Sequence, residues 1–352
     1  MKTVHISASK GYDVIIQAGG LETLGQRAAE VLRGRTVCLV SDDTVAGLYE
    51  AKARKSLEQA GFTVYTFVFP HGEQSKNGQV FLELLNFLAA HRLTRADGLI
   101  ALGGGVTGDL TGFAAACYLR GVDYIQVPTS LLAMVDSSVG GKTAVDLPAG
   151  KNLCGAFWQP VLVLCDTDLL ATLPKSIFRD GCAEVIKYGV LGDRPFFQRL
   201  KGGVQGNLED VVATCVDSKR RVVEADEFDT GPRQLLNLGH TLGHAVEAGS
   251  QFSLSHGQSV AIGMAMIARS AAEKGFCSAQ TRDEILNILT QYGLPITTDQ
   301  SAASIYRTAL GDKKRQGGTL TLVVPAEIGR CVLHKIPVEE LKSWIPPQEA
   351  GV

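Results

Sequence analysis

The sequence predicts an α/β domain with a parallel sheet over residues 1–170, followed by a mostly α-helical domain over residues 171–352. Short β-branched runs alternate with helical periodicities in the first half, which is the pattern of a parallel sheet covered by helices on both faces. Long helical periodicities dominate after about residue 168. A chain of 352 residues is also long enough to build two hydrophobic cores.

Near-continuous apolar runs predict the strands of the first domain, and the patterns between them predict its helices. The predicted strands are 36–42, 63–69, 97–105, 122–128 and 160–166. The predicted helices are 43–60, 76–92, 107–118 and 129–136. The opening segments KTVHIS and YDVIIQAG predict a two-stranded antiparallel entry to the sheet.

Helical periodicity continues through the second domain. Its predicted helices are FRDGCAEVIKYGVL, NLEDVVATCVDSKRRVVEAD, RQLLNLGHTLGHAVEAG, HGQSVAIGMAMIARSAAEKG and TRDEILNILTQYG. Only GTLTLVVP and GRCVLH, near the end, predict strands there. Because ligand sites favour domain boundaries, we expect a large ligand to bind in the cleft between the two domains.

The composition is that of an ordinary globular protein. Hydrophobic residues make up 45% of the chain and charged residues 20%, and the net charge is −2 with a pI of about 6.4. This balance excludes bulk electrostatic attraction to nucleic acid or to an anionic membrane. No run of 18 apolar residues occurs, and the first residues lack the apolar core of a signal peptide. We therefore expect a cytoplasmic protein with no nucleic-acid or membrane partner.

The segment GLIALGGGVTGDL contains a formal G-x-G-x-x-G pattern at Gly103, Gly105 and Gly108. It follows an apolar strand and opens a helical pattern, which is the context in which this motif binds a diphosphate. However, two earlier strands precede it, and no acidic residue ends the next strand. A phosphate-binding turn and a tight strand–helix turn are therefore equally good interpretations.

Two polar segments, 70–76 and 128–157, follow predicted strands at the edge where parallel sheets bind ligands. The second segment is a long loop rich in glycine, hydroxyls and lysine, and such loops are usually functional. Its hydroxyls and amides can bind a ribose or a polyol, and its lysines can bind anions. The alternative is a solvated surface loop. The residues of interest are Thr129, Ser130, Asp136, Lys142, Lys151 and Asn152.

Three of the seven histidines fall within 17 residues, at His240, His244 and His256. The first two lie four residues apart, so a helix would place them on one face. Thr241 stands where the H-E-x-x-H motif of zinc peptidases has its glutamate, which excludes that chemistry. Glu184 lies in an apolar helical stretch and is the best carboxylate to complete a divalent-metal site. The alternative is a set of buried core histidines.

Basic residues also recur in apolar or uncharged surroundings. If they converge, they suit a small substrate that carries phosphate and carboxylate groups, whereas each one alone is typical of a surface cation. They are Arg120, Lys142, Lys151, Lys187, Lys219, Arg233, Lys313 and Lys314.

A run of motifs resembles the 3-dehydroquinate synthase family over residues 36–325. In chain order the motifs are PHGEQSK, GGGVTGD, YLRGVDYIQVPTSLLAMVDSSVGGKTAVD, GKNLCGAFWQP, GCAEVIKYG, LNLGHTLGHAVE, SHGQSVAIGM and DKKRQGG. The resemblance implies a Rossmann-like NAD-binding domain, a helical domain that binds metal and substrate, and an active site between them. It also implies a cytoplasmic homodimer that uses NAD and a divalent metal, most often zinc, with cobalt as a substitute.

The resemblance assigns residues to each ligand by position. The implied metal ligands are Glu184, His240 and His256, which leaves His244 to contact the substrate. The implied NAD-binding residues are Asp42, Glu73, Lys76, Gly104, Gly105, Asp109, Thr129, Ser130, Asp136, Lys142, Lys151, Leu169 and Thr172. The implied catalytic and substrate-binding residues are Lys187, His244, Lys142, Asn152, Arg120, Lys219, Arg233, Asn237 and Lys313, the last in preference to Lys314.

The chain departs from the family pattern at Gln258, where the family commonly has the glutamate of an H-G-E motif. If that glutamate orients a metal ligand, Gln258 would accept a hydrogen bond without supplying charge, and the metal affinity would soften. The set of direct ligands is intact, so we expect activity to be retained.

The resemblance implies that the protein converts 3-deoxy-D-arabino-heptulosonate 7-phosphate to 3-dehydroquinate and phosphate. Oxidation of an alcohol with NAD makes the neighbouring proton acidic, phosphate leaves, and the returned hydride leaves NAD unchanged. The alternatives are a metal-dependent NAD(P) polyol or glycerol dehydrogenase, another sugar phosphate cyclase, and an inactive NAD-binding protein. Asn152 and Asn237, at the substrate positions of the synthase pattern, favour the dehydroquinate reaction over other cyclisations.

Overall fold

A seven-stranded sheet forms the centre of the first half of the chain in a computed structural model that describes residues 1–251, 253–313 and 318–347. The strand order is β1-β2-β9-β6-β5-β3-β4. Only the β1–β2 pair is antiparallel, and all the other pairs are parallel. The predicted parallel sheet with an antiparallel entry is therefore confirmed.

The strands of this sheet are short, and all except the edge strands β1 and β4 are mostly buried. They are β1 (Lys2–Ile6), β2 (Tyr12–Ile16), β3 (Thr36–Asp42), β4 (Thr63–Phe69), β5 (Gly98–Gly103), β6 (Asp123–Pro128) and β9 (Leu162–Cys165). The helices around it are α1 (Leu24–Val31), α2 (Asp43–Gln59), α3 (Gly78–Ala90), α4 (Gly105–Cys117) and α7 (Leu208–Ala225). The short helical turns are η1 (Gly20–Thr23), η2 (Glu73–Ser75), η3 (Tyr118–Arg120), η4 (Ala133–Ser137) and η5 (Thr167–Thr172).

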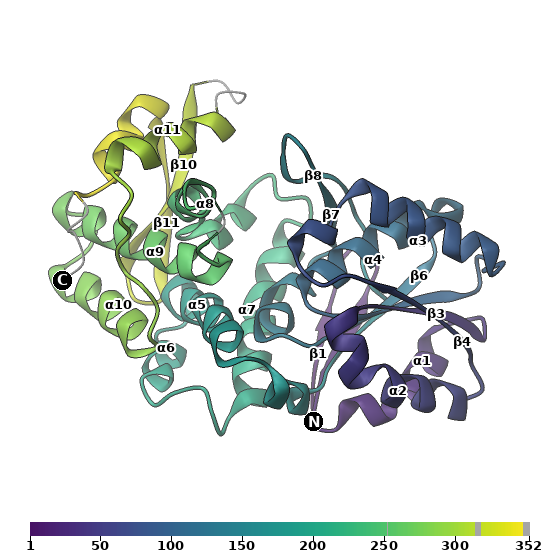
Figure 1. Ribbon diagram of the computed structural model, residues 1–352. Helices are drawn as coiled ribbons and strands as arrows, with labels where there is room; N and C mark the ends of the chain where they lie inside the picture. Colours follow the sequence, from purple (N-terminus) through teal and green to yellow (C-terminus); the bar gives the residue numbers. More distant parts are fainter. Residues whose placement is uncertain (252, 314–317, 348–352) are drawn as a thin grey trace. The chain divides into compact units, whose positions relative to one another are not determined.

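Both faces of the sheet bury apolar side chains, because successive strand residues point to opposite sides. Leu39 and Ile100 pack with α1 and α2 on one face. Val40 and Leu99 pack with α3 and α4 on the other face. Figure 1 shows these helices around β3 and β4. The near-continuous apolar strands of the sequence follow from this double burial.

The polar segment 128–157 is more ordered than the loop that we predicted. After the turn η4 it forms an antiparallel hairpin of β7 (Lys142–Leu147) and β8 (Gly150–Phe157). Thr143 Oγ1 donates to the Ala156 carbonyl across the hairpin at 2.8 Å. The mixture of glycine, hydroxyls and lysine hides the strand alternation, which explains why the sequence pattern suggests a loop.

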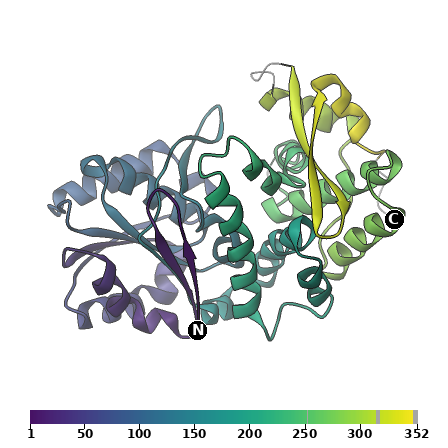
Figure 2. The ribbon, with the colours of Figure 1, turned by 180° about the vertical axis from the view of Figure 1, so that it is seen from behind.

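The chain divides into two compact units, and the division differs from the boundary at residue 170. The first unit is Met1–Pro174 with Gly206–Phe228, and the second is Lys175–Gln205 with Asp229–Val352. Helix α7 thus belongs with the sheet, beside the β1–β2 hairpin (Figure 2). The backbone N–H of Ser7 donates to Glu224 Oε1, and that of Ser9 donates to Glu227 Oε2, both at 2.8 Å. These contacts join segments more than 200 residues apart, so the local pattern could not reveal them.

The second unit is mostly helical, as predicted. Its helices are α5 (Lys175–Gly192), α6 (Arg194–Leu200), α8 (His240–Gly249), α9 (His256–Glu273), α10 (Ala279–Gln291) and α11 (Ala302–Lys313). Its short turns are η6 (Pro232–Asn237) and η7 (Val338–Trp344), and its hairpin is β10 (Thr319–Glu327) with β11 (Arg330–Pro337). Among the described residues, no helix combines the length and the apolar character that crossing a bilayer requires.

The segment 233–249, which the sequence suggests is one helix, is broken in two. Gly239 has a left-handed backbone with φ 80°, and it separates η6 from α8. An L-residue other than glycine is strained in this conformation, so the break is encoded by Gly239. As a result, α8 begins at His240.

Candidate active site

Four segments that we predicted to bind the cofactor follow strands of the first unit. Asp42 ends β3, Glu73 follows β4, Gly104 follows β5 and Thr129 follows β6. In a parallel sheet these strand ends share one edge, and β3 and β5 are neighbours there although β4 comes between them in the chain. Such a reversal of strand order leaves a crevice in which α/β proteins bind nucleotides.

The glycine turn between β5 and α4 brings the end of the strand close to the first turn of the helix. A Cβ on Gly103 would lie 2.3 Å from Thr107 Oγ1 on the first turn of α4, so no larger residue fits there. Gly104 is the N-cap of α4 and provides no side chain to cap the helix. The N–H groups of that first turn carry the positive end of the helix dipole, which suits an anion such as a diphosphate.

Lys76 lies at the centre of a buried polar cluster in the same unit. Its side chain is 5% exposed, and Nζ lies 2.5 Å from both Asp109 Oδ2 and Asn152 Oδ1. Burial alone would lower the pKa of Lys76, but Asp109 and Glu73 raise it above its usual value. The lysine is therefore a fixed cation. Glu73 also lies near a second cation, with Oε1 3.8 Å from Lys151 Nζ.

Lys219, which we predicted to bind substrate, is held by Asp136. Its Nζ donates to the Asp136 carbonyl oxygen at 2.7 Å and also pairs with the Asp136 carboxylate. Lys219 lies on α7 and is 7% exposed. Because α7 belongs to the first unit, Lys219 is part of the same unit as all of the predicted cofactor residues.

Other predicted residues of the first unit have local structural roles. Asp42 caps α2 by accepting the N–H groups of Thr44 and Val45 at 3.0 and 2.9 Å. Tyr49 donates its hydroxyl to the Leu169 carbonyl at 3.0 Å and pairs with the Thr172 hydroxyl. The remaining positions are Gly105 at the start of α4, Arg120 at the end of η3, Ser130 after β6 and Lys142 at the start of β7.

The second unit brings together the three predicted metal ligands. His240 Nε2 lies 3.4 Å, and His256 Nε2 3.2 Å, from the same oxygen, Oε1 of Glu184. Two donors on adjacent corners of a zinc tetrahedron, with bonds of about 2.0–2.1 Å, lie about 3.3–3.4 Å apart. Two nitrogens and one oxygen at this spacing fit zinc or cobalt, with the fourth corner left for a substrate oxygen.

Glycines hold the two histidine helices close together. A Cβ on Gly263 of α9 would lie 2.0 Å from the Gly239 carbonyl oxygen and 2.8 Å from the Gly243 nitrogen of α8. The backbones of α8 and α9 therefore touch at these positions. His240 and His256 are the first residues of their helices, and their ring centroids lie 5.4 Å apart.

The surroundings fix a different protonation state for each histidine. His240 Nδ1 lies 3.1 Å from the Leu238 carbonyl, so this nitrogen carries the proton and Nε2 keeps its lone pair. Burial lowers the pKa of His240 to about 3. Burial also acts to lower the pKa of His256, but hydrogen bonding to Glu184 and Glu247 outweighs it and raises that pKa to about 10.

His244 lies one turn along α8, where its ring faces both candidate ligands. Its centroid is 5.4 Å from that of His240 and 6.0 Å from that of His256. His244, Glu247 and His256 also place donor atoms within 4.8 Å of one another, as Glu184, His240 and His256 do. Glu247 is not among the residues that the sequence predicts for the site, although its place three residues after His244 puts it on the same helical face.

Lys187 lies on α5, beside the predicted metal ligand Glu184. It is 1% exposed and forms an ion pair with Oε2 of Glu184. Arg233 is buried in η6, and Asn237 ends that turn. Lys313 is the last residue of α11, but its side chain and the whole of Lys314 lie outside the described residues.

Gln258 has a structural role at the start of α9. Its Oε1 accepts the Ser255 backbone N–H at 3.0 Å, while the Ser255 side chain accepts the Gln258 backbone N–H, which completes a capping box. Glutamate and glutamine serve equally at this position of a capping box. The H-G-Q sequence is thus explained by helix capping.

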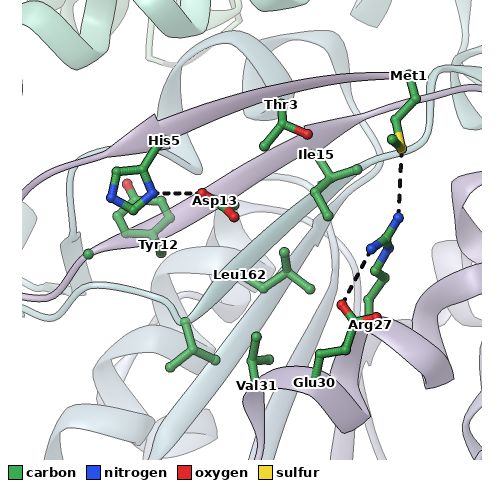
Figure 3. A pocket seen from close by; sticks show the side chains of 12 residues that line it. Met1, Thr3, His5, Tyr12, Asp13, Ile15, Arg27, Glu30, Val31 and Leu162 are labelled. Atoms are coloured by element: carbon green, nitrogen blue, oxygen red, sulfur yellow. Dashed lines mark hydrogen bonds and ion pairs between the residues drawn. The ribbon is translucent and has the colours of Figure 1, made fainter.

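A separate hollow of about 340 Å³ in the first unit contains none of the predicted site residues. It lies beside the β1–β2 hairpin, and its charged side chains face one another in pairs (Figure 3). His5 Nδ1 lies 2.7 Å from Asp13 Oδ1, and Arg27 pairs with Glu30 at 3.3 Å. The hollow therefore presents no cluster of cations for a phosphorylated ligand.

The chain is similar to known proteins along nearly its whole length. Residues 66–180 match the family described as 3-dehydroquinate synthase N-terminal, and residues 181–315 match the one described as 3-dehydroquinate synthase C-terminal. The 3-dehydroquinate synthase of Clostridium botulinum is 45% identical over 340 residues, which are 95% of this chain and 97% of that protein. The 3-dehydroquinate synthase of Streptococcus suis is 42% identical over 342 residues, 95% of this chain and 96% of that protein.

One similar solved structure is the 2-epi-5-epi-valiolone synthase of Streptomyces hygroscopicus with bound NAD⁺ and Zn²⁺. Its TM-score is 0.86 at 26% identity, covering 98% of this chain and 97% of that chain. A synthase with bound NAD⁺ and Zn²⁺ therefore shares this fold.

Proposed function

This chain belongs to the 3-dehydroquinate synthase family of carbon–oxygen lyases, and from that premise we propose how its residues form 3-dehydroquinate and phosphate from 3-deoxy-D-arabino-heptulosonate 7-phosphate. The observation that carries the proposal is the triad of Glu184, His240 and His256. Its three donor atoms converge, and both histidine nitrogens lie from the Glu184 oxygen at the spacing of a zinc site.

We assign the divalent cation to this triad and NAD to the carboxyl edge of the sheet. The valiolone synthase with this fold holds the same two groups, NAD⁺ and Zn²⁺. When bound, NAD supplies a hydride acceptor that is regenerated in each turnover, and the cation supplies a Lewis acid that acidifies a substrate hydroxyl. The glycine turn at Gly103 to Gly105 would hold the diphosphate, and the fixed ammonium of Lys76 would add positive charge beside it.

Lys187 and His244 move protons at the reacting hydroxyls in this proposal. Both lie beside the triad, Lys187 through its ion pair with Glu184 and His244 through its ring contacts with the other two histidines. A buried ammonium next to a carboxylate can donate and recover a proton without leaving its place. His244 is not needed as a ligand, because the triad already leaves a single open corner.

The remaining polar residues bind the two charged ends of the substrate. We assign the phosphate to Lys142, Asn152 and Arg233, and the carboxylate end with its ring hydroxyls to Lys219 and Lys313. Asn152 has a left-handed backbone with φ 57°, and its N–H donates to Asp146 Oδ1 at 2.7 Å. This conformation fixes the amide beside Lys76, where it can also reach a ligand. Arg120 and Asn237 complete the proposed substrate contacts.

We further propose that the active protein is a cytoplasmic homodimer. Family membership supports this assignment, and the net charge of −2 supports the absence of a nucleic-acid partner. Size-exclusion chromatography with light scattering at micromolar concentration tests the dimer directly. A single species of about 75 kDa, twice the 37.5 kDa chain, is expected.

The function is tested by removing and restoring the metal. Protein stripped with a chelator and then given Zn²⁺ or Co²⁺ should regain the ability to form 3-dehydroquinate from the heptulosonate phosphate, as identified by mass spectrometry. A polyol dehydrogenase would instead accumulate NADH with glycerol or another polyol. A different cyclase would release an inosose or valiolone product, and an inactive protein would show no metal-dependent turnover.

A further inference from the structure

Glu247 lies beside the proposed metal site, and the mechanism proposed above gives it no role. It lies on α8 and is 7% exposed, and its Oε2 lies 3.7 Å from His256 Nδ1. The opposite ring nitrogen of His256 faces Glu184, with Nε2 3.2 Å from Oε1. The imidazole of His256 therefore stands between two carboxylates, one on the metal side and one behind it.

His240, the other histidine of the triad, also has an acceptor at each ring nitrogen. Its Nε2 faces Glu184 at 3.4 Å, and its Nδ1 faces an acceptor, the Leu238 carbonyl, at 3.1 Å. In both rings an oxygen faces Nδ1, at hydrogen-bond distance for His240 and at ion-pair distance for His256, and this favours the proton on Nδ1 and the Nε2 lone pair for a cation. The two acceptors differ in charge, because the one behind His240 is a neutral carbonyl and the one behind His256 is a carboxylate.

The residue that family resemblance suggests for this role is already engaged. Gln258 lies two residues after His256, but its side chain accepts the Ser255 N–H at 3.0 Å in the capping box of α9. Its backbone N–H donates to Asp180 Oδ1 at 3.0 Å. Position 258 is thus committed to the helix end, and its loss of charge is not expected to change the basicity of His256.

We propose that Glu247 is a positioning residue that orients His256 and strengthens it as a metal ligand through a carboxylate–imidazole–metal relay. This inference rests on the proposed cation site at Glu184, His240 and His256. The carboxylate fixes the tautomer of His256 and increases electron density at Nε2, both of which favour cation binding. It acts through His256, so the first coordination shell keeps the same three protein ligands.

The test measures Zn²⁺ and Co²⁺ affinity by chelator competition in the absence of NAD and substrate. Glu247→Ala should weaken binding by about 10- to 100-fold, the range seen when such partners of a metal-binding histidine are removed. Glu247→Gln should fall between the wild type and Glu247→Ala, because its amide oxygen can still accept from Nδ1 but carries no charge. Gln258→Glu is the matched control and should leave the affinity within about twofold of the wild type.

Two further readouts separate positioning from other roles. The visible spectrum of the Co²⁺-loaded protein reports the ligand set, and its bands should keep their positions in Glu247→Gln. The double variant Glu247→Gln with Gln258→Glu should not recover affinity. Unchanged affinity in both Glu247 variants would overturn the proposal. So would shifted Co²⁺ bands, which would make Glu247 a direct ligand with His244 and His256. Failure of the proposed reaction would appear separately, as wild-type protein that binds the cation but forms no 3-dehydroquinate.

Discussion

The affinity of the metal-free protein for a divalent cation should rise steeply with pH, because the cation has to displace a proton from His256. The pKa of His256 is about 10 in the metal-free fold, whereas the pKa of His240 is about 3. Below pH 10, one proton therefore competes with each cation, and the affinity should increase about tenfold per pH unit. Between pH 7 and 9 the expected gain is about 90-fold, compared with roughly 1.3-fold for a histidine of ordinary pKa.

Rising pH should lower the stability of the metal-free fold through His256, whereas it should raise the affinity for the cation. The folded pKa of His256 lies above its usual value of 6.5. Charged His256 therefore stabilises the metal-free fold fully below pH 6.5, and this contribution is lost as the pH rises toward 10. Metal binding requires the neutral ring, so the affinity grows over the same range in which that stabilisation fades.

The assay is a chelator competition at pH 7, 8 and 9, corrected for the protonation of the chelator. Ionisation of a cation-bound water would also release a proton and give a similar pH dependence. His256 should therefore be titrated directly by NMR in the metal-free protein. Its signal is identified as the one that is absent from His256→Asn. A change of less than about threefold between pH 7 and 9, together with a His256 midpoint near 6.5, would refute the reasoning.

Three substitutions test other parts of the account. Lys187→Met should reduce turnover at least about 100-fold in steady-state assays, because it removes the proposed proton donor. Cation affinity, measured by chelator competition, should stay equal or rise, because the ammonium that competes for Glu184 is gone. Retained turnover would show that the lysine does not transfer the proton. Gly263→Ala should lower the free energy of unfolding by about 1–3 kcal/mol and weaken cation binding, since its Cβ would press α9 away from α8. The control is Gly311→Ala, where a Cβ would meet nothing within 4 Å, and it should change the free energy of unfolding by less than about 1 kcal/mol. Lys76→Met should weaken NADH binding in fluorescence titrations by at least about tenfold, because it removes the buried ammonium from the polar cluster proposed to bind NAD. Cation affinity should not change. Unaltered NADH binding would contradict the assignment of Lys76 to the cofactor.

The strands and the grouping of the histidines could be predicted because both are encoded locally. A buried parallel strand appears in the sequence as a continuous apolar run, and β3 falls on the predicted residues for this reason. The edge strand β4 also falls on the predicted residues, although it is only partly buried. Two histidines four residues apart share a helical face wherever the helix goes. The fold class is therefore confirmed, while the roles of the ligand residues stay predictions that the experiments above test.

Features that depend on contacts between distant segments could not be predicted. The placement of α7 with the sheet depends on Glu224 and Glu227, which bind backbone near the start of the chain. The meeting of α8 with α9 depends on how closely Gly263 approaches the preceding helix. The place of Glu247 beside His256 could not be predicted either, because an isolated glutamate on a helix is usually a solvated surface residue.

The central claim is that NAD acts as a recycled catalyst rather than as a consumed substrate. The most direct measurement incubates the metal-loaded protein with the heptulosonate phosphate and a trace of NAD⁺, and counts released phosphate against total NAD. The account predicts many phosphates per NAD, with no net NADH at the end. Phosphate release that stops at one equivalent of NAD, with NADH accumulating in proportion, would contradict it.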